Sequence, residues 1–385
     1  MASIVDTAPL VLDVGVVLMA AATSGLIARR VGLPAIVGYL LTGLLVSPFT
    51  PGFVADKNQL ALLADIGVVL LLFEVGIEID LKRIRRDHNA LVWAAPTQLL
   101  FGIAIGSPIF LFLDLPILGA LLLSLSLAMS SSVVIVNITR SRRRKTNTET
   151  EESLLGWSVL QDLVGVAAAA IILTLFGNSD KPLLESIGGL VGFVLFAILC
   201  AKVLPGLLKL VRWEKDLFLI YSVAIGLTIA ALGTVLFDIP MALASFVAGL
   251  SITQSRDTDE VRKAVLPFKD LFQVLFFVVV GSLVNPDLAL EALPFAAILL
   301  TMMFALKTLP IYLLSRLGKL KANRTQLSVG LSQIGEFSFV LGGAALAAGA
   351  ITETQFTGVL IAVIASIIFS TLSVRWSGHR ASRSI

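Results

Sequence analysis

The stretch LPFAAILLTMMFALKTLPIYLL, residues 293–314, decides the fold class, because it is almost entirely apolar and holds a single charge, Lys307. An apolar helix of about 20 residues crosses the hydrocarbon core of a bilayer. The stretch LLGWSVLQDLVGVAAAAIILTLF, residues 154–176, is similar but holds one charge of the opposite sign, Asp162. A charge at mid-membrane costs at least ~2.5–3.5 kcal/mol on insertion scales, so it normally faces a partner or a water-filled cavity. Two opposite titratable charges placed in this way predict a transporter site.

Apolar stretches of this length recur along the whole sequence, which has 385 residues and is 57% hydrophobic but only 14% charged. This composition indicates an all-α polytopic membrane protein. We expect thirteen transmembrane helices, counted from these stretches. They lie near residues 8–28, 33–49, 59–79, 89–113, 115–138, 153–176, 184–210, 216–236, 239–254, 268–285, 290–315, 325–349 and 356–376.

The basic residues indicate how these spans are oriented. All but three of the 29 lysines and arginines fall at alternate connections between the spans, the exceptions being Lys57, Lys181 and Lys307. Loops rich in Lys and Arg remain in the cytoplasm. We therefore expect a multi-pass protein of the cell's inner (plasma) membrane, with its N-terminus outside and its C-terminus in the cytoplasm.

The first six and the last six spans have comparable lengths and loop rhythm, with the seventh span between them. A single linking span gives the halves opposite orientations, which is the inverted-repeat plan of secondary transporters. Polar residues interrupt the fifth span at Ser130–Ser132 and its counterpart, the twelfth, at Gln333–Glu336. Because hydroxyl groups compete for backbone hydrogen bonds and Gly335 relaxes the chain, we expect two broken helices facing a cavity. The alternative is that these small residues only allow close helix packing.

Four segments of the sequence fit one known family. They are LPAIVGYLLTG (33–43), GVVLLLFEVGIEID (67–80), Gln161-Asp162 and SQIGEFSFVL (332–341). Together they resemble the second monovalent cation:proton antiporter family, and most closely its Kef-type potassium/proton branch. The resemblance extends in order over essentially the whole chain. It implies the fold of the bacterial sodium/proton antiporters, with two crossed, broken helices in a core domain beside a static dimerisation domain.

The resemblance also implies where ions bind. Asp162 is expected to hold the cation or the proton, and the alternative is a structural Asp162–Lys307 pair that ties two helices together. Neutral oxygens suit an alkali cation, and they are available as candidate ligands from Gln161, Ser130, Ser131 and Ser132. The expected breaks in the two helices involve these three serines together with Gln333 and Gly335.

Other charges are expected to support this site. Lys307 either occupies Asp162 when no ion is bound or balances another core charge. Glu336 is expected to stabilise the positive end of a broken helix or to pair with a basic group. Glu74 and Glu78, one helical turn apart, are possible residues of an inner vestibule.

The sequence departs from the family pattern in two places. Electrogenic sodium relatives carry two adjacent aspartates where this chain has Gln161-Asp162, so one carboxylate must serve here. Kef-type proteins usually continue into a nucleotide-binding domain, but this sequence has no Gly-x-Gly-x-x-Gly motif after a strand, so gating by such a domain is not expected. From the resemblance we expect a homodimer, with residues 1–58 and 184–265 mainly as scaffold and residues 59–176 and 268–376 mainly as the core.

The function predicted from these observations is exchange of K+ (or Na+) for H+ by elevator-like alternating access, one proton for one cation, in ion and pH homeostasis. The alternative is a gated K+ channel or efflux pore, which would need a filter of backbone carbonyls that is not apparent. An intramembrane hydrolase would need a base near Ser130–Ser132, and none is visible. We expect no enzyme activity, no cofactor and no nucleic-acid partner. With only the isolated His88 and His379, we also expect no transition-metal site.

Overall fold

The computed structural model describes residues 8–47, 49, 57–78, 89–140, 146–177, 182–253 and 258–381, and all regular structure in these ranges is helical. Among these residues, nine helices are long and apolar enough to cross a membrane, and three further apolar helices are shorter. Helix occupies each of the thirteen predicted ranges. The all-α, multi-pass architecture is therefore confirmed, whereas the number of crossings stays a prediction.

Helix contacts divide the chain into two compact units, and the first comprises residues 1–78 and 191–286. Its helices are α1 (Ala8–Val31), α2 (Ala35–Leu45), α3 (Lys57–Glu78), most of α9 (Leu183–Val211), α10 (Lys215–Phe237), α11 (Met241–Ile252) and α12 (Thr258–Ser282). Its buried core joins Phe73 of α3, Leu208 of α9, Ile225 of α10 and Val265 of α12. The unit is thus held by apolar packing of four or more helices around α3.

Two glycine contacts bring helix backbones together in this unit. A Cβ atom at Gly43 of α2 would lie 2.8 Å from Gly281 Cα of α12. A Cβ atom at Gly76 of α3 would lie 3.0 Å from Gly249 Cα of α11. Small residues allow such close packing between membrane helices. The first unit is therefore built on tight, side-chain-free contacts.

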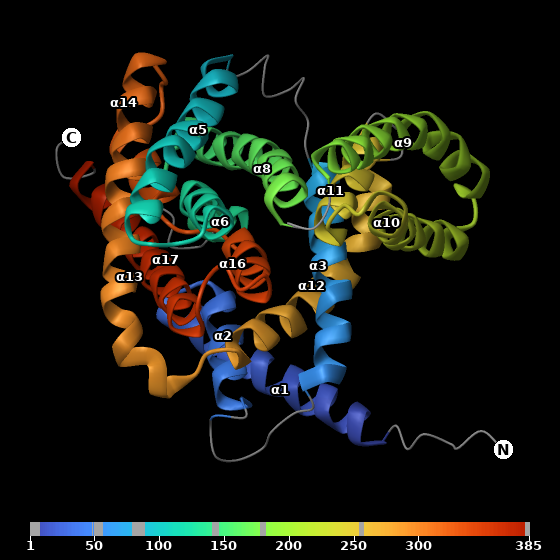
Figure 1. Ribbon diagram of the computed structural model, residues 1–385, viewed down its shortest axis with the longest axis horizontal. Helices are drawn as coiled ribbons and strands as arrows, with labels where there is room; N and C mark the ends of the chain where they lie inside the picture. Colours follow the sequence, from blue (N-terminus) through green and yellow to red (C-terminus); the bar gives the residue numbers. More distant parts are fainter. Residues whose placement is uncertain are drawn as a thin grey trace. The chain divides into compact units, whose positions relative to one another are not determined.

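The second unit comprises residues 79–190 and 287–385. Its helices are α5 (Asn89–Phe112), α6 (Ile117–Ala128), α7 (Ser132–Arg140), α8 (Thr148–Phe176), α13 (Ala289–Met303), the π-helix η2 (Phe304–Thr308), α14 (Leu309–Leu317), α15 (Arg324–Leu331), α16 (Phe337–Ala347) and α17 (Glu353–Ala381), and the short 3-10 helix η1 (Pro286–Leu288) precedes α13. Here α6 and α16 contact each other and lie between α8 and the pair α13 and α17 (Figure 1).

The helix contacts follow the inverted repeat predicted from the sequence. If the halves correspond span by span, α2 matches α11 and α3 matches α12. In the structure α2 packs on α12, and its counterpart α11 packs on α3. In the same way α5 packs on α8 as α13 packs on α17, and α6 packs on α8 as α15 packs on α17. Each contact in one half therefore has its counterpart in the other.

The units differ in one respect from the predicted division into scaffold and core. Helices α3 and α12 were expected among the core helices, but by contacts they belong to the first unit. The physical reason is the glycine packing, which joins α3 to α11 and α12 to α2 more closely than hydropathy alone indicates. Which unit is the scaffold and which the translocating core stays a prediction.

Candidate functional site

Two helices of the second unit are interrupted where polar residues predicted it. Helix α6 ends at Ala128 and α7 begins at Ser132, while α15 ends at Leu331 and α16 begins at Phe337. Chain reversal of hydrogen bonding at such points leaves main-chain N–H and C=O groups without helical partners. These groups are available to bind other parts of the protein or an ion.

The two breaks bind each other through reciprocal hydrogen bonds. Ser131 N–H donates to Gln333 Oε1 over 2.8 Å, and Gln333 Nε2 donates back to the Ser131 carbonyl over 3.1 Å. Gly335 N–H donates to the Met129 carbonyl over 3.1 Å. Gln333 therefore acts mainly as a structural link between the breaks, which its sequence position did not reveal.

The serines of the first break are also engaged across the crossing. Ser130 Oγ donates to the Leu331 carbonyl over 2.8 Å, and Ser132 Oγ donates to Glu336 Oε1 over 3.3 Å. Glu336 is buried and directly precedes α16, at the positive end of that helix. The lone pairs of these hydroxyls remain free for a cation, so their role as ligands stays a prediction.

Gly335 is required by this crossing. A Cβ atom at this position would lie 2.8 Å from the carbonyl carbon of Ser130 and 2.9 Å from its oxygen. Real Cβ atoms do not approach backbone so closely, so one of the breaks would have to shift. Gly335 thus fixes how near the two chains pass, in addition to relaxing its own helix.

Lys307 lies in a local widening of the helix, the π-helix between α13 and α14. Leu309 N–H bonds the Phe304 carbonyl, five residues back. Pro310 has no N–H to offer the turn before it, and this missing donor helps to explain the wide turn. The signal for this bulge, a proline three residues after the buried lysine, was present in the sequence but was not interpreted.

The amino group of Lys307 binds one carbonyl from each break. Its Nζ lies 2.6 Å from the Met129 oxygen and 2.6 Å from the Gln333 oxygen, and the residue is 1% exposed. An ammonium group has three protons to donate, so these two bonds leave a third. The expectation that Lys307 balances a core charge thus takes a specific form, because it compensates the carbonyl ends of the broken helices.

Asp162 lies in α8 and is 1% exposed. It is close enough to Lys307 for their charges to interact. The structure therefore brings together the two buried charges that the sequence singled out, within one unit and beside the crossing of the broken helices.

Gln161 belongs to an amide network that the sequence did not predict. Its Nε2 donates to the Ala128 carbonyl over 3.1 Å and to Gln98 Oε1 of α5. Gln98 Nε2 also reaches the Ala128 carbonyl, over 3.4 Å. Gln98 was overlooked because an isolated glutamine in an apolar span gives little indication of its partner.

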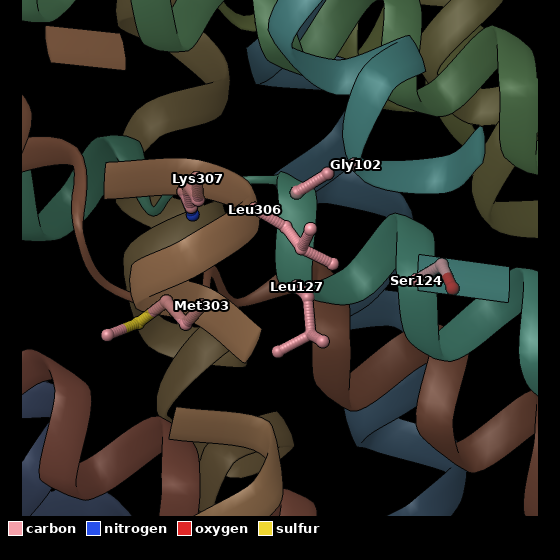
Figure 2. Close-up of a pocket in the computed structure, with 7 residues that line it drawn as sticks. Gly102, Ser124, Leu127, Met303, Leu306 and Lys307 are labelled. Atoms are coloured by element: carbon pink, nitrogen blue, oxygen red, sulfur yellow. The ribbon is translucent and has the colours of Figure 1, made fainter. Parts of the chain in front are cut away.

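A small hollow lies next to the π-helix, as Figure 2 shows. It is lined by Gly102, Ser124, Leu127, Ala128, Met303, Leu306 and Lys307. The Ser124 hydroxyl already donates to the Ala120 carbonyl, and most other lining groups are hydrocarbon. The hollow is therefore poorly suited to a cation. Within the described ranges, no three His, Cys, Asp or Glu side chains are placed to hold a metal ion.

Glu74 and Glu78 lie in the first unit, where both bind Arg262 of α12. Arg262 Nε lies 2.7 Å from Glu74, and its terminal nitrogen lies 2.7 Å from Glu78. Lys269 approaches Glu74 to 4.0 Å. The sequence offered Lys82 and Arg83 as partners for Glu78, but both lie outside the described residues. That Glu74 or Glu78 lines a vestibule stays a prediction.

Comparisons with known proteins agree with this architecture. The curated protein YbaL of Escherichia coli (strain K12), named as a candidate cation/proton antiporter, is 29% identical over 366 residues, which are 90% of this chain and 64% of YbaL. The chain therefore spans less than two thirds of that relative.

Two solved structures share the fold. The sodium proton antiporter MjNhaP1 from Methanocaldococcus jannaschii at pH 8 superposes with a TM-score of 0.74 at 19% identity, covering 96% of this chain and 98% of that one. A three-dimensional electron-microscopy map of the same antiporter gives 0.65 at 18% identity, covering 96% of each chain. The model of the transmembrane sodium/hydrogen exchanger family matches residues 16–378. This chain, with its crossed broken helices and buried Asp162 and Lys307, belongs to that sodium/hydrogen exchanger family.

Proposed function

We propose that this protein is a secondary antiporter that exchanges a monovalent cation, K+ in preference to Na+, for H+. The observation that carries the proposal is the placement of buried Asp162 and Lys307 beside the crossing of two broken helices. An intramembrane charge in such surroundings is a functional group by default, because burying it costs several kcal/mol or is offset by a partner (about 2.5–3.5 kcal/mol on insertion scales). The family and the relative YbaL, named as a candidate cation/proton antiporter, support the same reaction.

Cation and proton compete for Asp162. With Gln161 neutral, one carboxylate serves both ions, so one proton exchanges for one cation and the cycle is electroneutral. An empty, ionised Asp162 resists crossing, because its charge would lose compensation in the bilayer core. The crossing therefore occurs with either ion bound, and this requirement couples the two fluxes.

The second unit holds both breaks and both charges, so it is the part that we propose to move. Asp162 is buried, and exposing it alternately to the two sides calls for an elevator-like displacement of this unit. The first unit is the proposed scaffold and the site of homodimerisation. The placement of Lys and Arg supports a plasma-membrane orientation with the C-terminus in the cytoplasm. The preference for K+ rests on the likeness to the Kef-type branch.

The test is proton movement in proteoliposomes that contain a pH-sensitive dye. K+, Na+ and Li+ are titrated in turn, with and without valinomycin to clamp the potential in the K+ series. We expect dye responses driven by the cation in the wild type, unaffected by the clamp, and their loss in Asp162→Asn. Asp216→Asn, which removes an exposed carboxylate, serves as the control. Cation-driven proton movement that persists in Asp162→Asn would overturn the proposal, as would cation flux without proton counter-movement.

A further inference from the structure

We propose that Gln98 is a positioning residue that fixes the side-chain amide of Gln161 so that its oxygen faces the transported cation. The inference rests on the proposed function and adds to it a residue outside the family motifs. Gln98 lies in α5 and is fully buried, as is Gln161 in α8. What Gln161 offers an ion depends on which side of its amide is bound elsewhere.

Both protons of the Gln161 amide are already used. One is donated to Gln98 Oε1 and the other to the Ala128 carbonyl over 3.1 Å. A primary amide has two N–H donors, so the nitrogen has no further proton to give. The amide therefore cannot present its N–H side to a cation without breaking two hydrogen bonds.

The oxygen of the same amide is in the opposite condition. Gln161 Oε1 is buried and accepts no hydrogen bond from the residues that the structure describes. Buried polar atoms are normally satisfied, and an unsatisfied one calls for an explanation such as an unmodelled water or ion. Gln161 directly precedes Asp162, the proposed ion-binding carboxylate. A hard carbonyl oxygen beside a carboxylate is suited to an alkali cation.

Gln98 contributes at both ends of its own amide. Its oxygen accepts from Gln161, and its Nε2 reaches the Ala128 carbonyl over 3.4 Å. Ala128 is the last residue of α6, so its carbonyl lies at the negative end of a broken helix. Without Gln98 the Gln161 amide loses the partner that distinguishes its nitrogen from its oxygen. It is then free to rotate and turn N–H groups toward the cation.

The test measures transport by the same dye assay in a double-mutant cycle of Gln98→Leu, Gln161→Leu and the double variant. We expect Gln98→Leu to raise the apparent KM for K+ about tenfold, with the maximal rate within about twofold of wild type. In the Gln161→Leu background, Gln98→Leu should change the KM by less than about twofold, because its effect passes through Gln161. Gln98→Glu, which keeps an acceptor for Gln161 Nε2, should recover most of the affinity.

Gln273→Leu is the matched control, since it removes a buried glutamine from α12 in the first unit. Thermal unfolding in detergent shows whether each variant is folded. Equal KM effects of Gln98→Leu in both backgrounds, or a fall in maximal rate with KM unchanged, would overturn the inference. Cation-driven proton movement that persists in Asp162→Asn would instead defeat the proposed function, so the two failures are distinguishable.

Discussion

In the first unit the carboxylate of Glu74, 4% exposed, lies 2.7 Å from the Arg262 guanidinium, whereas in the second unit Lys307, 1% exposed, donates to two main-chain carbonyls. Both are charges buried within apolar helices. The first is compensated by a fixed opposite charge on a neighbouring helix. The second is compensated by the ends of two broken helices, and Asp162 nearby interacts with it electrostatically.

This difference separates a structural charge cluster from a working one. A carboxylate paired with Arg262 has little reason to change its occupancy, because losing the pair leaves a buried guanidinium uncompensated. Asp162 has no such obligate fixed partner in Lys307, whose amino group is already bound to Met129 and Gln333. The proposed ion site is therefore where helix ends, rather than opposite side chains, compensate charge.

The largest effect is expected for Lys307→Met, which removes the compensation from both helix ends. Two buried carbonyls then lose their donor, at a cost of about 2–5 kcal/mol in stability. We expect transport to fall at least a hundredfold and the midpoint of thermal unfolding in detergent to drop. Lys263→Met, at an exposed position on α12, is the control. Wild-type transport in Lys307→Met would show that the breaks do not need this ammonium group.

The next effect is expected for Gly335→Ala, which tests whether the breaks must pass each other closely. The added Cβ meets the Ser130 backbone at 2.8 Å, so overpacking should cost about 1–3 kcal/mol and lower transport at least tenfold. Gly343→Ala lies in the same helix with nothing within 4 Å of the added atom. That variant should transport normally. Equal transport in both variants would contradict the requirement for a close crossing.

The smallest effect is expected in the first unit, where Glu74→Gln and Glu78→Gln each weaken one bond to Arg262. Glu74 is nearly buried and Glu78 is about one third exposed, so Glu74→Gln should lose about 1–3 kcal/mol and Glu78→Gln less than about 1 kcal/mol. The apparent KM for K+ should remain within about twofold in both, measured by the dye assay. A clear rise in KM for Glu74→Gln would place that residue on the ion route instead.

The architecture was predictable because its main signals are local. Spanning helices follow from apolar length, and the two breaks follow from clusters of small polar residues at Ser130–Ser132 and Gln333–Glu336. The likeness between the halves was visible in span length alone. Each of these features depends on one segment and the solvent around it.

Contacts between distant segments were not predictable in the same way. Nothing at Gln98 indicates that it would meet Gln161, and nothing at Glu74 indicates Arg262, which is 188 residues further on. The bond from Lys307 to Met129 likewise joins residues 178 positions apart. Such partners are set by how the helices of each unit pack. The glycine contacts that assign α3 and α12 to the first unit belong to the same class.

The most direct test of the account is the number of protons released when the purified protein binds K+. Titration calorimetry in two buffers of different ionisation enthalpy gives this number near the pH at which Asp162 is protonated. If the carboxylate holds either ion but not both, about one proton leaves for each K+ bound in the wild type, and Asp162→Asn binds K+ weakly with no proton release. K+ binding by the wild type without proton release would contradict the account.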